Sequence, residues 1–136
     1  MAVITRRLEF DAAHRVMRHE SKCRNLHGHR YVVEVTVSGE LDSLGRVVDF
    51  GVVKDVLGTW IDARLDHGAI LNQEDEALVW FCRSHDWKVY VMGCNPTAEN
   101  IASEILGVAS RLLSDDLSVG RVRVRETPNC WADAFR

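Results

Sequence analysis

Apolar and polar residues alternate along two segments in the first third of the chain. In residues 3–14, Leu8, Phe10 and Ala12 precede His14 on the even-numbered face, and in residues 31–39 the odd-numbered face carries Tyr31 and three valines. A period of two is typical of strands that are buried on one side. We therefore predict two antiparallel strands, with His14 pointing inward at the end of the first.

Other segments repeat apolar residues every three or four positions, which predicts helices. Asp49 is expected to cap a helix whose apolar stripe runs from Val52 to Ile61. Asn95 is expected to cap the longest helix, with Pro96 in its first position. The remaining predicted elements are a helix at residues 74–84 and short strands at residues 46–49, 87–92 and 120–127.

Size and composition indicate one domain spanning residues 1–136. A chain of 136 residues that is 46% hydrophobic can bury one core and is short for two. Its net charge of −3 argues against a dedicated binder of nucleic acid or anionic membranes. No apolar run is long enough to span a bilayer, and the N-terminal charges do not fit a signal peptide. We therefore expect a cytoplasmic protein with no nucleic-acid or membrane partner.

Three histidines are predicted to converge where the first two strands meet. His27 and His29 extend the odd-numbered face of the second strand backwards, so both point to the side that carries His14. If the strands pair antiparallel, the end of the first lies beside the start of the second. Three neutral imidazoles with an open fourth position are typical of a catalytic zinc site. His14, His27 and His29 are therefore candidate Zn²⁺ ligands.

The loop between these strands combines a thiol with several positive charges. Cys23 lies four residues before His27, where it could act as a nucleophile or base beside the metal. The cysteines form no Cys-x-x-Cys pair, so no disulfide framework is predicted. The basic residues of the loop are Arg15, Arg18, Lys22, Arg24 and Arg30, against one acid, Glu20. They form either a solvated surface loop or a binding site for a phosphate-bearing substrate.

Two acidic positions later in the chain are further candidates. Asp66 and His67 follow a predicted helix and form either a capped turn or a proton shuttle whose tautomer the carboxylate fixes. Glu126 shares the inward face of the last strand with Val122 and Val124, where a free carboxylate is costly. Its partner is either a neighbouring arginine, although those face the other side, or a ligand edge with two adjacent N–H donors.

Five motifs, in this order along the chain, resemble the 6-pyruvoyltetrahydropterin synthase superfamily. They are Phe10-Asp-Ala-Ala-His14, Cys23-x-x-x-His27-Gly-His29, Leu65-Asp66-His67, Asn95-Pro-Thr-Ala-Glu99-Asn and Glu126-Thr127. The spacing between Cys23 and His27 is similar to that of the bacterial 6-carboxytetrahydropterin synthase branch, which acts in queuosine and deazapurine biosynthesis. The resemblance spans nearly the whole chain, although residues 71–93 are longer than the matching segment of compact members.

The resemblance implies a fold, an assembly and a set of site residues. The fold is an α+β tunnelling fold (T-fold) with a four-stranded antiparallel sheet and two long helices on one face. The assembly is a homotrimer or homohexamer with active sites between subunits. The implied site residues are the zinc ligands His14, His27 and His29, the catalytic residues Cys23, Asp66 and His67, and the pterin anchor Glu126. Thr97, Lys22 and Arg24 are expected to contact the substrate as well.

The implied reaction is zinc-dependent and converts 7,8-dihydroneopterin triphosphate to 6-carboxy-5,6,7,8-tetrahydropterin, with release of triphosphate and acetaldehyde. A 6-pyruvoyl-type triphosphate elimination is the first alternative. A cupin-like metal-binding protein is another, in which Glu34 joins His27 and His29, but Glu34 is on the opposite strand face and two helices fit an all-β barrel poorly. A non-catalytic pterin-binding oligomer also stays open.

Overall fold

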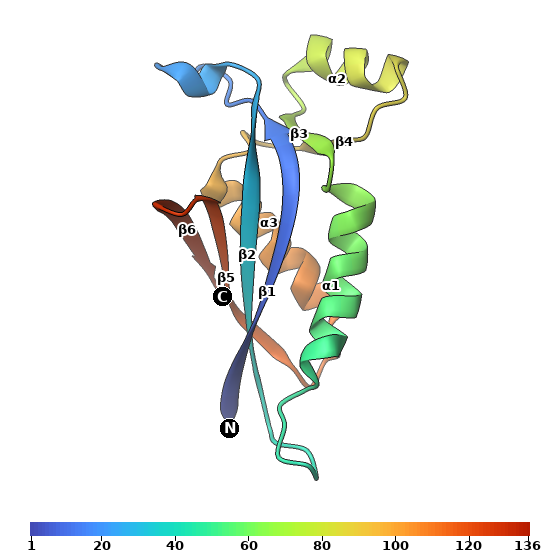
Figure 1. Ribbon diagram of the computed structural model, residues 1–136, viewed down its shortest axis with the longest axis vertical. Coiled ribbons are helices and arrows are strands. Elements are labelled where there is room, and N and C mark those ends of the chain that lie inside the picture. The colour runs from blue at the N-terminus through green and yellow to red at the C-terminus, as the bar shows by residue number, and fades with distance from the viewer.

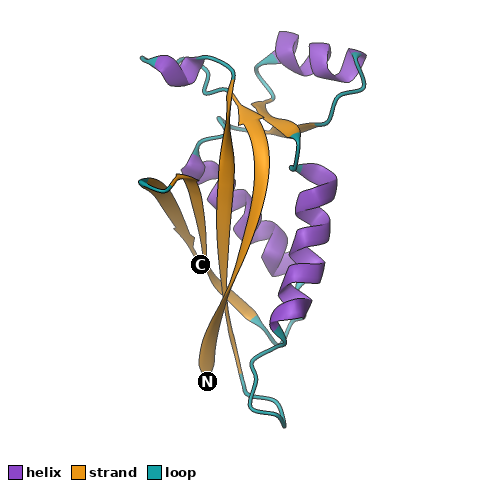
Figure 2. Ribbon diagram, viewed as in Figure 1, coloured by secondary structure: helices purple, strands orange, loops and turns teal.

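The computed structural model describes residues 1–136 and centres on one six-stranded mixed sheet (Figures 1 and 2). The strands are β1 (Ala2–His14), β2 (His27–Gly39), β3 (Gly68–Asn72), β4 (Val89–Met92), β5 (Ser118–Thr127) and β6 (Cys130–Phe135). The helices are α1 (Phe50–Arg64), α2 (Glu76–Ser84) and α3 (Ala98–Leu112), with a short 3-10 turn, η1, at Lys22–Arg24. The strand order in the sheet is β4-β3-β1-β2-β5-β6.

The long pair β1 and β2 forms the middle of the sheet and confirms the predicted antiparallel pairing. Phe10 lies opposite Tyr31, and His14 lies opposite His27. The inward residues of both strands belong to one buried core together with residues of α1 and α3, and Phe10 and Tyr31 stack with ring centroids 5.0 Å apart. The alternation seen in the sequence therefore directs one face of this pair into the core.

The predicted four-stranded antiparallel sheet was wrong in strand number and partly wrong in direction. Two short strands, β3 and β6, were missed, and β3 runs parallel to both β1 and β4. The last three residues of β3 are all buried, so the segment has no alternation of apolar and polar residues. The α+β class itself agrees with the prediction, and an open sheet packed with helices excludes the cupin-like barrel.

The helix starts show one confirmed cap and one wrong cap. Asp49 caps α1 as predicted, because its side chain accepts a hydrogen bond from the Gly51 amide. The cap of α3 is Thr97, not Asn95, and its hydroxyl accepts from the Asn100 amide. Pro96 therefore precedes the helix. The predicted strand at residues 46–49 is also wrong, since no strand forms between β2 and α1.

The segment β3-α2-β4 forms a small unit at one end of the molecule, on the same end as the loop that carries η1 (Figure 1). Its own apolar cluster consists of Leu71, Val79 and Cys82. The helix and the second strand agree with the predictions for residues 74–84 and 87–92 to within two residues. Neither α2 nor any other helix has the length and hydropathy that a membrane crossing requires.

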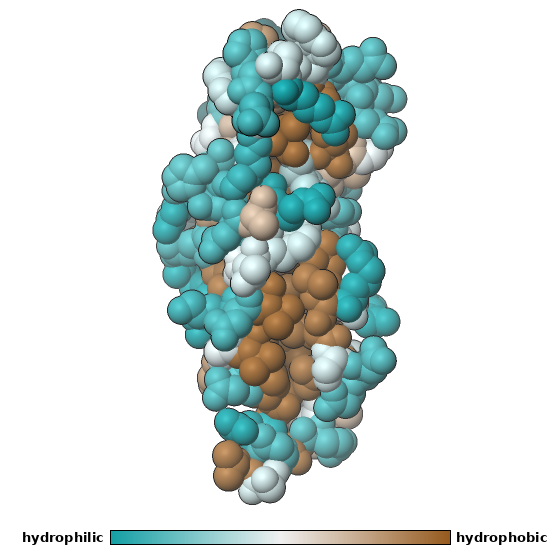
Figure 3. All heavy atoms as spheres, turned by 90° about the vertical axis from the view of Figure 1, so that its right-hand side faces the viewer, coloured by the Kyte–Doolittle hydropathy of each residue, from teal (hydrophilic) through white to brown (hydrophobic).

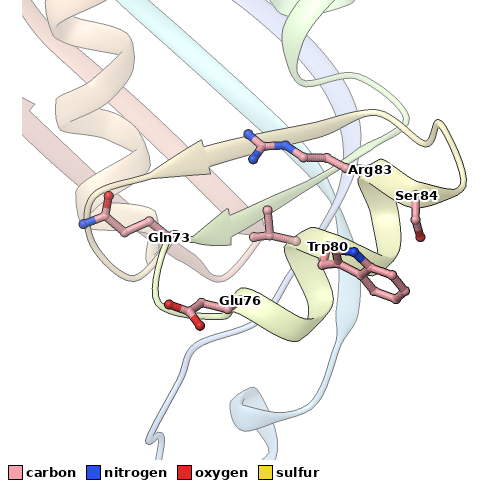
Figure 4. Close-up of a pocket in the computed structure, with 6 residues that line it drawn as sticks. Gln73, Glu76, Trp80, Arg83 and Ser84 are labelled. Carbon is pink, nitrogen blue, oxygen red and sulfur yellow. The ribbon is translucent and has the colours of Figure 1, made fainter.

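A shallow pocket lies beside α2 (Figure 4). The residues lining it are Gln73, Glu76, Val79, Trp80, Arg83 and Ser84. None of the site residues predicted from the sequence lines this pocket. The predicted metal ligands lie instead where β1 ends and β2 begins.

Candidate metal centre and active-site cavity

Three histidines meet at the end of the β1–β2 pair, as the strand alternation predicts. One ring nitrogen from each of His14, His27 and His29 lies within 4.8 Å of the others. The ring centroids are 4.6 to 5.1 Å apart, and each pair of rings meets edge to face. This spacing allows the three nitrogens to bind a single ion placed between them.

The second nitrogens of two of these rings fix how the rings are turned. His14 Nδ1 donates to the Pro96 carbonyl at 2.7 Å, and His27 Nδ1 donates to the Asn25 carbonyl at 2.7 Å. Because a carbonyl only accepts, each Nδ1 carries the proton and each Nε2 is left with a lone pair. Backbone carbonyls thus aim both Nε2 atoms at the centre of the cluster.

The arrangement of these lone pairs fits a bound cation. The Nε2 atoms of His14 and His27 lie 3.1 Å apart, so two lone pairs face each other and need a positive charge between them. His29 Nε2 is buried and has no hydrogen-bond partner at all. Three imidazole donors and no thiolate ligand suit a divalent ion such as zinc, with a coordination position left for a substrate.

Burial keeps the His14 and His29 rings in the neutral form that binds metal. Burial lowers the pKa of His14 below the ordinary histidine value, and burial likewise lowers the pKa of His29. Both imidazoles are therefore neutral near pH 7. Neutral imidazole is the ligand form, so the ring nitrogens do not need to lose a proton before an ion binds.

Gly28, between two of the histidines, is held close to the neighbouring strand. A Cβ at this position would lie 3.1 Å from the Ala12 carbonyl oxygen. The β1 backbone cannot move away easily, because Ala12 pairs with β2 on one side and with Gly68 of β3 on the other. We expect Gly28→Ala to lower the free energy of unfolding by about 1–3 kcal/mol, measured by urea denaturation of the metal-free protein.

Gly58→Ala is the matched control for this substitution. Gly58 lies within α1, and a Cβ there meets nothing within 4 Å. Alanine is the better helix former, so the free energy of unfolding should stay equal or rise by up to about 1 kcal/mol. Equal stability of the two variants would show that the strand spacing at Gly28 does not restrict the side chain.

Glu126 points to the same side as the histidines, as its position in the strand predicts. Its carboxylate oxygens lie 4.0 Å from His14 Nε2 and 3.9 Å from His29 Nε2. The group of side chains whose ligand atoms all lie within 4.8 Å of one another consists of the three histidines and does not include Glu126. The neighbouring arginines pair elsewhere, Arg123 with Asp133 and Arg125 with Glu34. The Glu126 carboxylate therefore remains available to a ligand.

One cavity joins several of the predicted residues. Its lining consists of His14, Val16, His19, Cys23, Thr97, Ala98, Glu99, Glu126, Cys130 and Trp131. Cys23 is partly exposed within η1, and Thr97 keeps its hydroxyl proton free to donate because its oxygen caps α3. Lys22 and Arg24 are exposed on either side of Cys23 and do not line the cavity.

Six cavity residues were not among the predicted site residues, namely Val16, His19, Ala98, Glu99, Cys130 and Trp131. Two of them, Cys130 and Trp131, come from a hairpin that sequence reasoning missed. Both lie in β6, which pairs antiparallel with β5 and places Trp131 opposite Arg125. The Arg125 guanidinium lies over the Trp131 ring, 4.2 Å from its centroid. A turn after Pro128 followed by a short alternating segment was the signal that could have indicated this hairpin.

The pair of Asp66 and His67 is ordered but lies outside this cavity. Asp66 accepts a hydrogen bond from the Asp11 amide at 2.9 Å and from His67 Nδ1 at 2.7 Å. Burial alone would raise the pKa of Asp66, but these two hydrogen bonds and the charges of His67 and Lys88 together outweigh it, so the pKa lies below the ordinary value. The His67 side chain is 76% exposed. The single chain therefore presents an oriented imidazole to its surroundings rather than to its own histidine cluster.

The sequence of this chain is similar to those of several known proteins. Residues 3–136 match the family model described as 6-pyruvoyl tetrahydropterin synthase. A 6-carboxy-5,6,7,8-tetrahydropterin synthase from Rickettsia bellii is 44% identical over 137 residues, which cover 98% of this chain and 99% of that protein. A protein with the same name from Haemophilus influenzae is 33% identical over 141 residues, covering 98% of each chain.

Solved structures agree with this fold over nearly the whole chain. An uncharacterised protein from Wolinella succinogenes superposes with a TM-score of 0.84 at 26% identity, covering 99% of this chain and 98% of the other. The 6-pyruvoyl tetrahydropterin synthase of Caenorhabditis elegans gives 0.72 at 25% identity, with 99% and 95% coverage. The predicted T-fold is thereby confirmed, with six strands in place of four.

Proposed function

Because the chain belongs to the 6-pyruvoyl tetrahydropterin synthase family, we propose that it is a zinc-dependent 6-carboxy-5,6,7,8-tetrahydropterin synthase. The proposed reaction converts 7,8-dihydroneopterin triphosphate to 6-carboxytetrahydropterin, with release of acetaldehyde and triphosphate, as a step in queuosine or deazapurine biosynthesis. Relatives that carry the synthase name are 33–44% identical over nearly the full chain. The observation that carries the proposal is one cavity that combines a metal-binding histidine, a thiol and a free carboxylate.

The histidine cluster and Glu126 would hold the two ends of the reacting part of the substrate. A zinc ion on His14, His27 and His29 would lower the pKa of a substrate hydroxyl and stabilise the negative charge that develops there. The Glu126 carboxylate would accept two N–H donors from the pterin edge, which orients the ring. Thr97 would donate its hydroxyl proton to the same ligand.

Cys23 is the proposed base in this cavity. Cys23 belongs to the cavity lining together with His14 and Glu126, beside the space that the substrate would occupy. In thiolate form it would take a proton from the substrate carbon next to the activated hydroxyl. Lys22 and Arg24 are exposed on either side of this thiol, where their charges would attract the triphosphate.

Asp66 and His67 are proposed to act in the active site of another copy of the chain. Their exposure, and their absence from the cavity of their own chain, support a site that is completed between subunits. The Asp66 carboxylate holds His67 Nδ1, which leaves Nε2 free to exchange a proton with a substrate. This assignment requires that the protein is a homo-oligomer.

Two open strand edges and one apolar surface support a homotrimer or homohexamer. β3 pairs with β1 only at residues 12–14, so residues 2–11 of β1 have no neighbouring strand on that side. The opposite edge of the sheet is formed by β6. Open edges readily accept a strand from another chain. Apolar side chains are also exposed on the face that carries α1 (Figure 3), where Phe50 is 52% and Val52 43% exposed.

Product identification tests the proposed reaction. The purified, zinc-loaded protein is incubated with 7,8-dihydroneopterin triphosphate, and the products are separated and identified by mass spectrometry. We expect 6-carboxytetrahydropterin, acetaldehyde and triphosphate in equal amounts. A pyruvoylpterin in place of the carboxypterin would instead establish the 6-pyruvoyl-type elimination.

Metal removal is the control for the same assay. Dialysis against a chelator should abolish turnover, and one equivalent of Zn²⁺ per chain should restore it, because the histidine cluster offers a single site. Metal content is measured by elemental analysis before and after dialysis. Full turnover by protein without stoichiometric metal would contradict the proposed role of the three histidines.

A further inference from the structure

The loop that carries Cys23 is held by polar contacts rather than by regular structure. Between β1 and β2 it contains only the short turn η1. The Val16 amide donates to the Cys23 carbonyl at 3.0 Å, which closes the loop on itself. Two contacts that begin at residues next to this closure, Met17 and Arg15, connect the loop to other parts of the fold.

The first contact is made by the Asn95 side chain. Its Oδ1 accepts from the Met17 amide at 3.0 Å, and its Nδ2 donates to the Met17 carbonyl at 3.0 Å. This is the pairing that a neighbouring strand would make. Asn72, only 3% exposed, donates from Nδ2 to the same Oδ1 at 3.1 Å and holds the Asn95 amide in this orientation.

The second contact is made by Arg15. Its Nε donates to the Arg24 carbonyl at 2.8 Å, directly after the thiol, and its Nη1 lies 2.9 Å from Asp75 Oδ1. Asp75 is 6% exposed and occupies the N-cap position of α2, yet its side chain makes no capping hydrogen bond. A carboxylate at an N-cap ordinarily binds the first helical amides. Here the Asp75 carboxylate pairs with the Arg15 guanidinium instead.

Both contacts connect the loop to residues that lie near the hydrogen-bond partner of His14. Pro96, next to Asn95, accepts the hydrogen bond from His14 Nδ1. Asn72 and Asp75 lie at the end of β3 and the start of α2, in the small unit beside the loop (Figure 1). The loop and the histidine ring are therefore attached to one group of neighbouring residues.

We propose that Arg15, Asp75 and Asn95 are positioning residues that hold the Cys23 thiol at a set place relative to the histidine cluster. The segment β3-α2-β4 then has a role in the site, because it supplies the buried anchors Asn72 and Asp75. This proposal rests on the proposed function for its kinetic readout only. The position of the thiol is measured without any substrate.

Arg15→Lys and Asp75→Asn test the proposal. Lysine keeps the charge but cannot bind the Arg24 carbonyl and Asp75 through two nitrogens at once, and asparagine keeps the shape of Asp75 without its charge. In both variants we expect alkylation of Cys23 by N-ethylmaleimide, followed by peptide mass spectrometry, to become faster. Metal content should stay at the wild-type level, and Cys82, which is buried, should remain unmodified in the folded protein.

Kinetics provide the second readout. Displacing a reacting group by about 1 Å lowers the rate of the chemical step, so kcat should fall about 10–100-fold while KM changes little. If the wild-type protein does not turn over 7,8-dihydroneopterin triphosphate, the proposed function fails, and the alkylation rates still decide the positioning of Cys23.

Glu74→Gln is the matched control. Glu74 precedes Asp75 and pairs with Arg18 in the same loop, but both side chains are exposed, 58% and 68%, and such pairs contribute little. We expect wild-type alkylation of Cys23 and wild-type kcat in this variant. If Arg15→Lys, Asp75→Asn and Glu74→Gln all show the same alkylation rate and kcat, the proposal is overturned. A lower melting temperature alone, with wild-type kcat and alkylation, likewise overturns it.

Discussion

Replacing Cys23 with alanine is expected to lower kcat for 7,8-dihydroneopterin triphosphate by about 10²–10⁴-fold, the usual contribution of a positioned general base. The side chain of Cys23 lies at the cavity rather than in the core, so the substitution leaves no buried void. The hydrogen bond that closes the loop uses the Cys23 carbonyl, which alanine retains. Metal content and melting temperature should therefore match those of the wild type, while steady-state turnover is lost.

Cys94→Ala is the control for this experiment, since Cys94 is exposed and does not line the cavity. It should retain wild-type kcat and KM. Normal turnover by a folded, zinc-loaded Cys23→Ala protein would remove Cys23 from the role of base.

Replacing His67 with alanine should abolish turnover, and mixing this variant with Cys23→Ala protein should restore activity. An exposed side chain held only by Asp66 can be removed without disturbing the core. If each site takes its thiol from one chain and its imidazole from another, random mixing of the two variants leaves about a quarter of the sites intact. Turnover is measured after subunit exchange, with native mass spectrometry to verify the mixed assemblies.

His85→Ala is a suitable comparison, because His85 is another exposed histidine that follows a helix. It should retain full activity without mixing. Mixed assemblies of the Cys23 and His67 variants that stay inactive would contradict a site shared between chains. A folded His67→Ala protein with normal turnover would contradict any role for this imidazole in the reaction.

The histidine cluster could be predicted because each of its determinants is local. His14 ends one alternating segment, His27 and His29 begin the other, and the register pairs His14 with His27. Side chains on a strand point alternately to opposite faces, so parity alone assigns all three rings to one side. Glu126 follows the same rule on β5.

The helix caps and short strands were less predictable, because several positions compete for each role. Asn95 had the right chemistry for an N-cap, but its amide binds Met17 in the folded chain, and Thr97 caps α3 instead. β3 has no alternation because both of its faces are covered. In each case the outcome depends on what packs nearby rather than on the residue itself.

The sequence by itself determined the faces of the long strands, and with them the residues that meet at the metal centre. Only the tertiary structure decided that Asp75 binds Arg15 rather than its own helix, and that His67 is exposed outside the cavity of its own chain. The physical reason is how far along the chain the determining residues lie. The direction of a side chain along a strand is set by the local backbone, whereas a polar group takes its partner from whatever distant segment the fold brings within hydrogen-bonding distance.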